Sequence, residues 1–109
     1  MSIPSEVLAK LKILETLYQQ GKSNEVINQT LDKIINQELA ESRQKNQELE
    51  AEIQRFEQQY QMSSAEFYQR FHSGELGDEI DWVEWNAFYH QMWMTLQEQI
   101  KLLQSTDNL

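Results

Sequence analysis

The two histidines, His72 and His90, are the side chains that could do acid–base or metal chemistry near neutral pH. Glu75 and Asp78 follow His72 closely enough to form an acid–base group with it. Neither histidine has a companion at ligand spacing, and the sequence contains no HExxH, CxxC or calcium-loop pattern. It contains no glycine-rich phosphate loop and no nucleophile elbow either. We therefore expect no enzyme, no metal site and no cofactor.

Charged and aromatic side chains are concentrated in one stretch of the chain. Residues 72–93, HSGELGDEIDWVEWNAFYHQMW, contain five acidic residues and three tryptophans. Clustered carboxylates attract Lys and Arg, and large aromatic side chains are enriched at protein interfaces. Two interpretations remain open: these aromatics form the core of a small helical domain, or they form a surface that binds a basic partner.

The formal net charge of −9 lies entirely in the second part of the chain. Residues 1–45 hold six basic and six acidic residues, whereas residues 46–109 hold three basic residues against twelve acids. An acidic surface repels phosphate, so we expect the protein alone not to bind nucleic acid. A basic protein is the complementary partner.

The composition predicts an all-α fold and a cytoplasmic protein. Only three glycines and one proline occur among 109 residues, Gln, Glu, Leu and Ile are abundant, and no alternating strand pattern extends over more than a few residues. The chain has no cysteine, and its start lacks the apolar core of a signal peptide. No apolar run approaches the roughly 18–20 residues that a membrane span needs.

An N-terminal helical hairpin is predicted by the first apolar pattern. We expect a helix from about Ser5 that ends at Gly21, followed by a turn in which Ser23 or Asn24 caps a second helix. The apolar face of the first helix repeats at steps of three and four and consists of Val7, Leu8, Leu11, Leu14, Leu17 and Tyr18.

The second helix is predicted to be long, because neither Gly nor Pro interrupts residues 25–59. From residue 39 its apolar positions fit a heptad, which predicts a dimeric coiled coil within a domain of residues 1–60. Asn46 at an a position would fix the register of the two strands. The alternative is a hairpin within one chain, against the C-terminal helix. The residues expected to pair the two chains are Leu39, Asn46, Leu49, Ile53 and Phe56.

The C-terminal region, residues 61–109, is predicted to be an acidic, aromatic helix pair. Ser63 and Glu66 match a capping box, and Asp78 could cap the last helix, from about 79 to 103. On that helix the centre of the aromatic stripe, expected to face the protein's own helices, is Trp85, Tyr89, Met92 and Leu96. The residues expected to bind the partner are Glu75, Asp78, Glu79, Asp81, Trp82, Glu84, Phe88 and Trp93.

Two stretches resemble known families. Residues 60–92, with MSSAEFY, GELGD and DWVEW, resemble the C-terminal part of small antitoxins of bacterial and archaeal toxin–antitoxin modules. This resemblance implies that the protein binds a cognate toxin, which we expect to be basic, and neutralises it by occlusion. Residues 21–35, GKSNEVINQTLDKII, resemble the turn and second helix of ribbon-helix-helix proteins, which would imply a DNA-binding autoregulator. Only Met1–Ile3 precede Pro4 in this sequence, so we do not expect the DNA-reading strand of that family. A structural or adaptor coiled-coil protein without a toxin is the other alternative.

Overall fold

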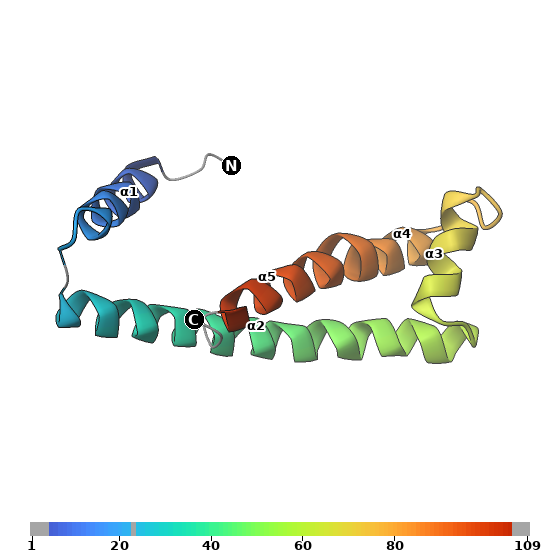
Figure 1. Ribbon diagram of the computed structural model, residues 1–109. Coiled ribbons are helices and arrows are strands. Elements are labelled where there is room, and N and C mark those ends of the chain that lie inside the picture. The colour runs from blue at the N-terminus through green and yellow to red at the C-terminus, as the bar shows by residue number, and fades with distance from the viewer. Residues whose placement is uncertain (1–4, 23, 106–109) are drawn as a thin grey trace. The chain divides into compact units, whose positions relative to one another are not determined.

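The computed structural model describes residues 5–22 and 24–105, and this part of the chain contains helices and no strand, which confirms the all-α prediction. The chain divides into two compact units between Lys33 and Ile34. The helices in chain order (Figure 1) are α1 Ser5–Gln19, α2 Glu25–Tyr60, α3 Ser64–His72, α4 Ile80–Asn86, the π-helix η1 Ala87–Trp93, and α5 Met94–Gln104.

The N-terminal unit contains α1 and the first turns of α2. Gly21 ends α1 with a φ of +93°, a conformation that only glycine adopts readily. The N–H of Gly21 donates to the carbonyl of Tyr18 at 3.0 Å, and the N–H of Lys22 donates to the carbonyl of Leu17 at 3.1 Å. This pair of hydrogen bonds is the Schellman motif, so the predicted end of the first helix is confirmed.

Asn24 caps α2, as one of the two sequence alternatives predicts. Its side-chain oxygen accepts from the N–H groups of Val26 at 2.9 Å and Ile27 at 3.4 Å. The hydroxyl of Tyr18 donates to the Asn24 carbonyl at 2.9 Å and so ties the end of α1 to the start of α2. The other predicted cap, Ser23, and the segment before Ser5 lie outside the described residues.

The C-terminal unit is a helical hairpin within one chain. In Figure 1, α4 and α5 (orange to red) lie beside α2 (green), and α3 (yellow) connects the two layers. Phe56 late in α2 stacks on Trp85 in α4, whereas Asn46 earlier in α2 accepts a hydrogen bond from Gln97 in α5. The two layers therefore run antiparallel. Gln61, with a φ of +52°, makes the turn that follows α2.

The predicted dimer seam lies in the core of this hairpin. The buried side chains on α2 are Leu39, Leu49, Ile53 and Phe56, and the predicted register residue Asn46 bonds to α5 of the same chain. The intramolecular alternative is therefore what the structure contains. A homodimer stays a prediction.

The last helix differs from its prediction in two respects. The N-cap residue of α4 is Glu79 rather than Asp78, and its side chain makes no capping hydrogen bond. The middle of the last helix, Ala87–Trp93, is π-helical, so each turn holds more residues than the α-helical wheel assumes. Met92, predicted to face the core, is consequently 49% exposed, whereas Leu96 is buried.

Candidate partner-binding surface

Trp85 organises the aromatic core against which the candidate surface is built. Its side chain is fully buried, and its ring stacks on Phe67 with centroids 4.1 Å apart and on Phe56 with centroids 5.6 Å apart. The indole N–H donates to the buried hydroxyl of Ser64 at 2.9 Å. The backbone N–H of Ser64 in turn donates to the carboxylate of Glu57 at 2.9 Å. This chain of contacts fixes α2, α3 and α4 to one another.

Of the five acidic residues predicted to bind a partner, one links two helices by a hydrogen bond and the other four are exposed. The carboxylate of Asp81 accepts a hydrogen bond from the Tyr60 hydroxyl and so links α4 to α2. The hydrogen bond to Asp81, burial, and the negative charges of Asp81 and Glu79 raise the pKa of Tyr60 above its ordinary value. The acidic side chains that are exposed are Glu75, Asp78, Glu79 and Glu84.

Exposed apolar side chains accompany these acids on the outer face of α4, which we define as Glu79, Ile80, Val83 and Glu84. Ile80 is 73% exposed and Val83 is 49% exposed. At helical spacing the four residues share the side of α4 opposite to Trp85. An apolar centre between two carboxylates is the arrangement that complements apolar and basic groups on a partner.

The three aromatics predicted to bind a partner are each half-buried and lie in different places. Trp82 packs on Tyr60, with ring centroids 4.5 Å apart, and on Phe67 at 5.8 Å. Phe88 packs at the edge of the core, 6.3 Å from Phe56. Trp93 stacks on Tyr89 at 5.7 Å. The structure therefore does not bring these three rings onto one surface.

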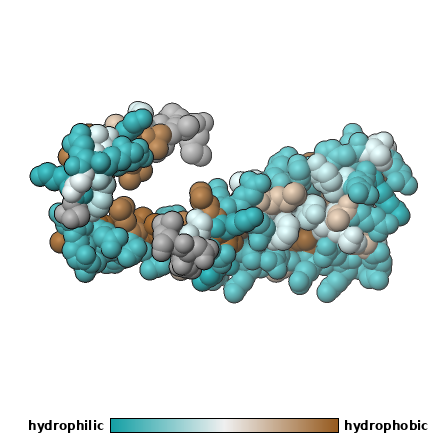
Figure 2. Space-filling view, in the orientation of Figure 1, coloured by the Kyte–Doolittle hydropathy of each residue, from teal (hydrophilic) through white to brown (hydrophobic). Residues whose placement is uncertain are grey.

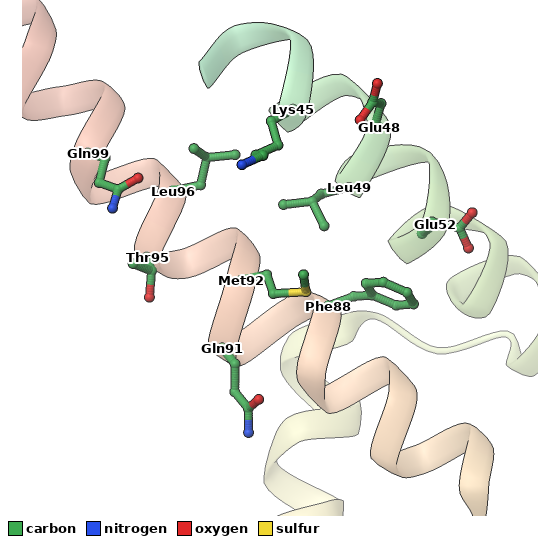
Figure 3. Close-up of a pocket in the computed structure, with 10 residues that line it drawn as sticks. All are labelled: Lys45, Glu48, Leu49, Glu52, Phe88, Gln91, Met92, Thr95, Leu96 and Gln99. Atoms are coloured by element: carbon green, nitrogen blue, oxygen red, sulfur yellow. The ribbon is translucent and has the colours of Figure 1, made fainter. Parts of the chain in front are cut away.

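Phe88 instead lines a groove between α2 and η1–α5, which we call the seam groove. Its volume is about 460 Å³, within the range of ordinary ligand pockets. Figure 3 shows Leu49, Phe88 and Met92 pointing toward one another in this space, while Glu48 and Glu52 project from α2 at its rim. The remaining lining residues are Lys45, Gln91, Thr95, Leu96 and Gln99.

The rim of the seam groove is acidic but not uniformly so. Glu52 pairs with Arg55 at 3.0 Å, and both side chains are about half exposed. An exposed pair of this kind is weak and is screened by salt. The Arg55 guanidinium also lies over the ring of Phe56, 4.9 Å from its centroid. A basic partner at this rim would therefore compete with Arg55 for Glu52. It would not have to displace a basic side chain from Glu48, which forms no salt bridge with the described residues.

Trp93 lines a smaller groove of about 160 Å³ that also lies between α2 and η1. Its lining includes two acids of α2, Glu50 and Glu57. Glu57 is held by the Ser64 N–H, and Glu50 accepts from Asn46 at 2.6 Å. Both carboxylates thus take part in the fold, so this groove is a weaker candidate than the seam groove.

The structure brings the two histidines together, which sequence spacing did not indicate. The rings of His72 and His90 lie 6.0 Å apart, and the ring of Tyr68 lies 4.1 Å from His72 and 4.4 Å from His90. The Tyr68 hydroxyl and Nε2 of His90 are 3.2 Å apart, within hydrogen-bond distance. Among residues 5–22 and 24–105, no three His, Cys, Asp or Glu side chains are placed to hold a metal ion.

Several candidate binding residues were missed from the sequence. Ile80 and Val83 were treated as ordinary helix positions, yet they are exposed beside the predicted acids. Met92 was assigned to the core because the wheel assumed a regular α-helix. Glu48 and Glu52 could have been found only by knowing which helix packs on α2, because their place at a groove depends on that contact.

No family model, curated protein or solved structure matches this chain. The resemblance to antitoxins therefore stays a prediction. In the described part of the chain, no helix combines the length and the apolar character that crossing a bilayer requires.

Proposed function

We propose that this protein is a binding protein of the antitoxin type, which neutralises a basic partner protein by covering it. The observation that carries the proposal is that the whole net charge of −9 belongs to the unit that also leaves an apolar groove open. Residues 1–33 hold four lysines and four acids, and residues 34–109 hold five basic residues and fourteen acids. Charge of one sign beside exposed apolar surface favours fast and specific capture of an oppositely charged protein.

The two parts of the surface would contribute differently to binding. The seam groove offers Met92 and Phe88 as apolar contacts that lose water on binding, and such central contacts usually dominate affinity. Glu79 and Glu84 on the outer face of α4 are exposed and would act mainly on the rate of encounter. Binding by these surfaces needs no catalytic residue, so we propose that the protein is not an enzyme.

The test is to co-express the chain with the small basic protein of a neighbouring gene, purify the pair, and measure affinity and association rate. Met92→Asp should weaken binding about 30-fold or more, as for an interface hot spot of about 2 kcal/mol. Leu102→Asp is the matched control, because Leu102 is 72% exposed and does not line the groove. Changing Glu79 and Glu84 together to Gln should lower the association rate and reduce its dependence on salt.

Two results would overturn the proposal. If the neighbouring basic protein does not bind, the adaptor alternative gains support. If Leu102→Asp weakens binding as much as Met92→Asp does, the seam groove is not the binding site.

A further inference from the structure

The N-terminal unit leaves its apolar side chains uncovered. No side chain of α1 is buried, and between residues 5 and 33 only Leu14 and Ile27 are even half-buried among those described. Figure 2 shows apolar atoms, in brown, on the surface of α1 and of the first turns of α2. The large apolar side chains that are exposed in this unit are Val7, Leu8, Leu11, Ile13, Leu17, Tyr18, Val26 and Leu31.

Four of these eight side chains, Val7, Leu11, Tyr18 and Leu31, lie on one side of the hairpin. At helical spacing Val7, Leu11, Leu14 and Tyr18 share one face of α1. Between this face and α2 lies an open apolar groove of about 230 Å³. We call it the hairpin groove, and it is lined by Leu11, Leu14, Glu15, Tyr18, Ile27, Asn28 and Leu31.

A unit of this size cannot stay folded with its apolar face in water. Isolated helices of about 15 residues are marginal, and domains below about 40 residues usually need oligomerisation or another support. The turn at Gly21 and Asn24 is nevertheless built with a complete set of caps. A well-specified turn between two helices with an open apolar face indicates that something covers this face.

We propose that a second copy of the chain covers the hairpin groove, so that two N-terminal units pair around a two-fold axis. Charge decides between a second copy and a basic partner. Four lysines balance four acids in residues 1–33, so this unit offers no net attraction to a basic protein and no net repulsion to its own copy. Two copies of the C-terminal unit, at −9 each, would repel each other.

The exposed area fits a weak dimer. Half-exposed Leu, Val and Tyr side chains each leave roughly 50 Å² of apolar surface. The five that lie on or beside the groove face therefore offer about 500 Å² in a symmetric pair. Because an interface is only about 57% apolar, the total would be roughly 900 Å², slightly below the about 1,000 Å² of a stable specific interface. We therefore expect a dissociation constant in the micromolar range or above. These five are Val7, Leu8, Leu11, Tyr18 and Leu31.

Sedimentation velocity of the full chain from about 1 to 100 µM tests the proposal, and it does not depend on the proposed function. The mass should rise with concentration from 13.0 kDa toward twice that value, and added salt should not lower it, because salt screens the repulsion between the acidic units. Leu11→Glu and Leu31→Glu should each weaken the dimer 100-fold or more, because a two-fold pair buries two added carboxylates. Leu102→Glu, an equally drastic change of an exposed leucine in the C-terminal unit, should leave the mass unchanged.

Unfolding of the C-terminal unit cannot be mistaken for dissociation in this design. All three tryptophans lie in the C-terminal unit, so an unchanged Trp emission spectrum shows that this unit is intact in each variant. Leu31 lies on α2, a helix that the C-terminal core also supports, so Leu31→Glu keeps its helix. A 13.0 kDa wild-type protein over the whole concentration range would overturn the proposal. Dissociation by Leu102→Glu and not by Leu31→Glu would do so as well.

Discussion

The hydrogen bond from Trp85 to Ser64 allows a sharp test of how the C-terminal core is specified. Ser64→Ala removes the acceptor of a fully buried indole N–H, while Ser64 itself is only 3% exposed. Water has no access to replace the lost oxygen. A buried donor left without a partner costs about 1–3 kcal/mol, and we take about 2 kcal/mol.

A smaller effect opposes this loss. Ser64 is the first residue of α3, and Ala is a better helix former than Ser by about 0.5 kcal/mol. The expected net loss is therefore about 1.5 kcal/mol of unfolding free energy. For a unit of this size, that corresponds to a fall of roughly 6–12 °C in Tm.

Urea titrations followed by Trp fluorescence and by circular dichroism measure the loss. Ser73→Ala is the matched control, because the Ser73 hydroxyl donates to the Arg70 carbonyl at an exposed position. It should cost only a few tenths of a kcal/mol. Trp85→Phe keeps an aromatic ring on Phe67 but has no N–H, so Ser64→Ala should cost nothing in that background. Equal costs for Ser64→Ala in the two backgrounds, or a cost no larger than that of Ser73→Ala, would refute the reasoning.

Three further predictions concern the turns after α2 and α3 and the link between α2 and α4. Gln61 has a φ of +52°, a conformation that costs a residue with a side chain more than it costs glycine, so Gln61→Gly should raise the free energy of unfolding by about 1 kcal/mol. Gly74 has a φ of +83° with open space around it, so Gly74→Ala should lower the free energy of unfolding by a similar amount. Urea titration measures both changes. Because the pKa of Tyr60 is higher in the folded protein than in the unfolded chain, its contribution to stability is complete below pH 10.0 and is lost as pH rises through the folded value. Melting curves from pH 8 to 11 should show this loss, and Tyr60→Phe should remove it; an unchanged slope in that variant would contradict the assignment.

Helix ends were the most predictable part of the fold, because local chemistry determines them. Gly21 ends α1 through its left-handed backbone, and Asn24 and Ser63 each accept hydrogen bonds from the N–H groups of the helix that follows. Each of these devices acts within a few residues, so the sequence contains all the information that is needed. The cap at Asp78 was wrong because nothing local distinguishes it from Glu79, which is also acidic.

The candidate site was less predictable, because it depends on the π-helical segment. A wheel drawn at 3.6 residues per turn places Met92 with Trp85 in the core, but the wider turns of η1 rotate Met92 into the seam groove. The same segment places His90 against Tyr68. Extra residues per turn leave no mark on hydrophobic spacing that could be recognised beforehand, so the exposure of Met92 was beyond sequence reasoning, whereas Leu96 is buried as predicted.

The heptad on α2 predicts a partner helix, and in the structure the C-terminal helices of the same chain supply one. Apolar residues at a and d positions show that a helix has a partner, but not whether that partner belongs to the same chain. Here the turn at Gln61 and the bond between Ser64 and Trp85 bring the C-terminal helices back onto α2. One copy of the chain already covers Leu49, Ile53 and Phe56, whereas no side chain of α1 is buried. A symmetric pair through the neutral hairpins, as proposed, would use none of the side chains that form this core.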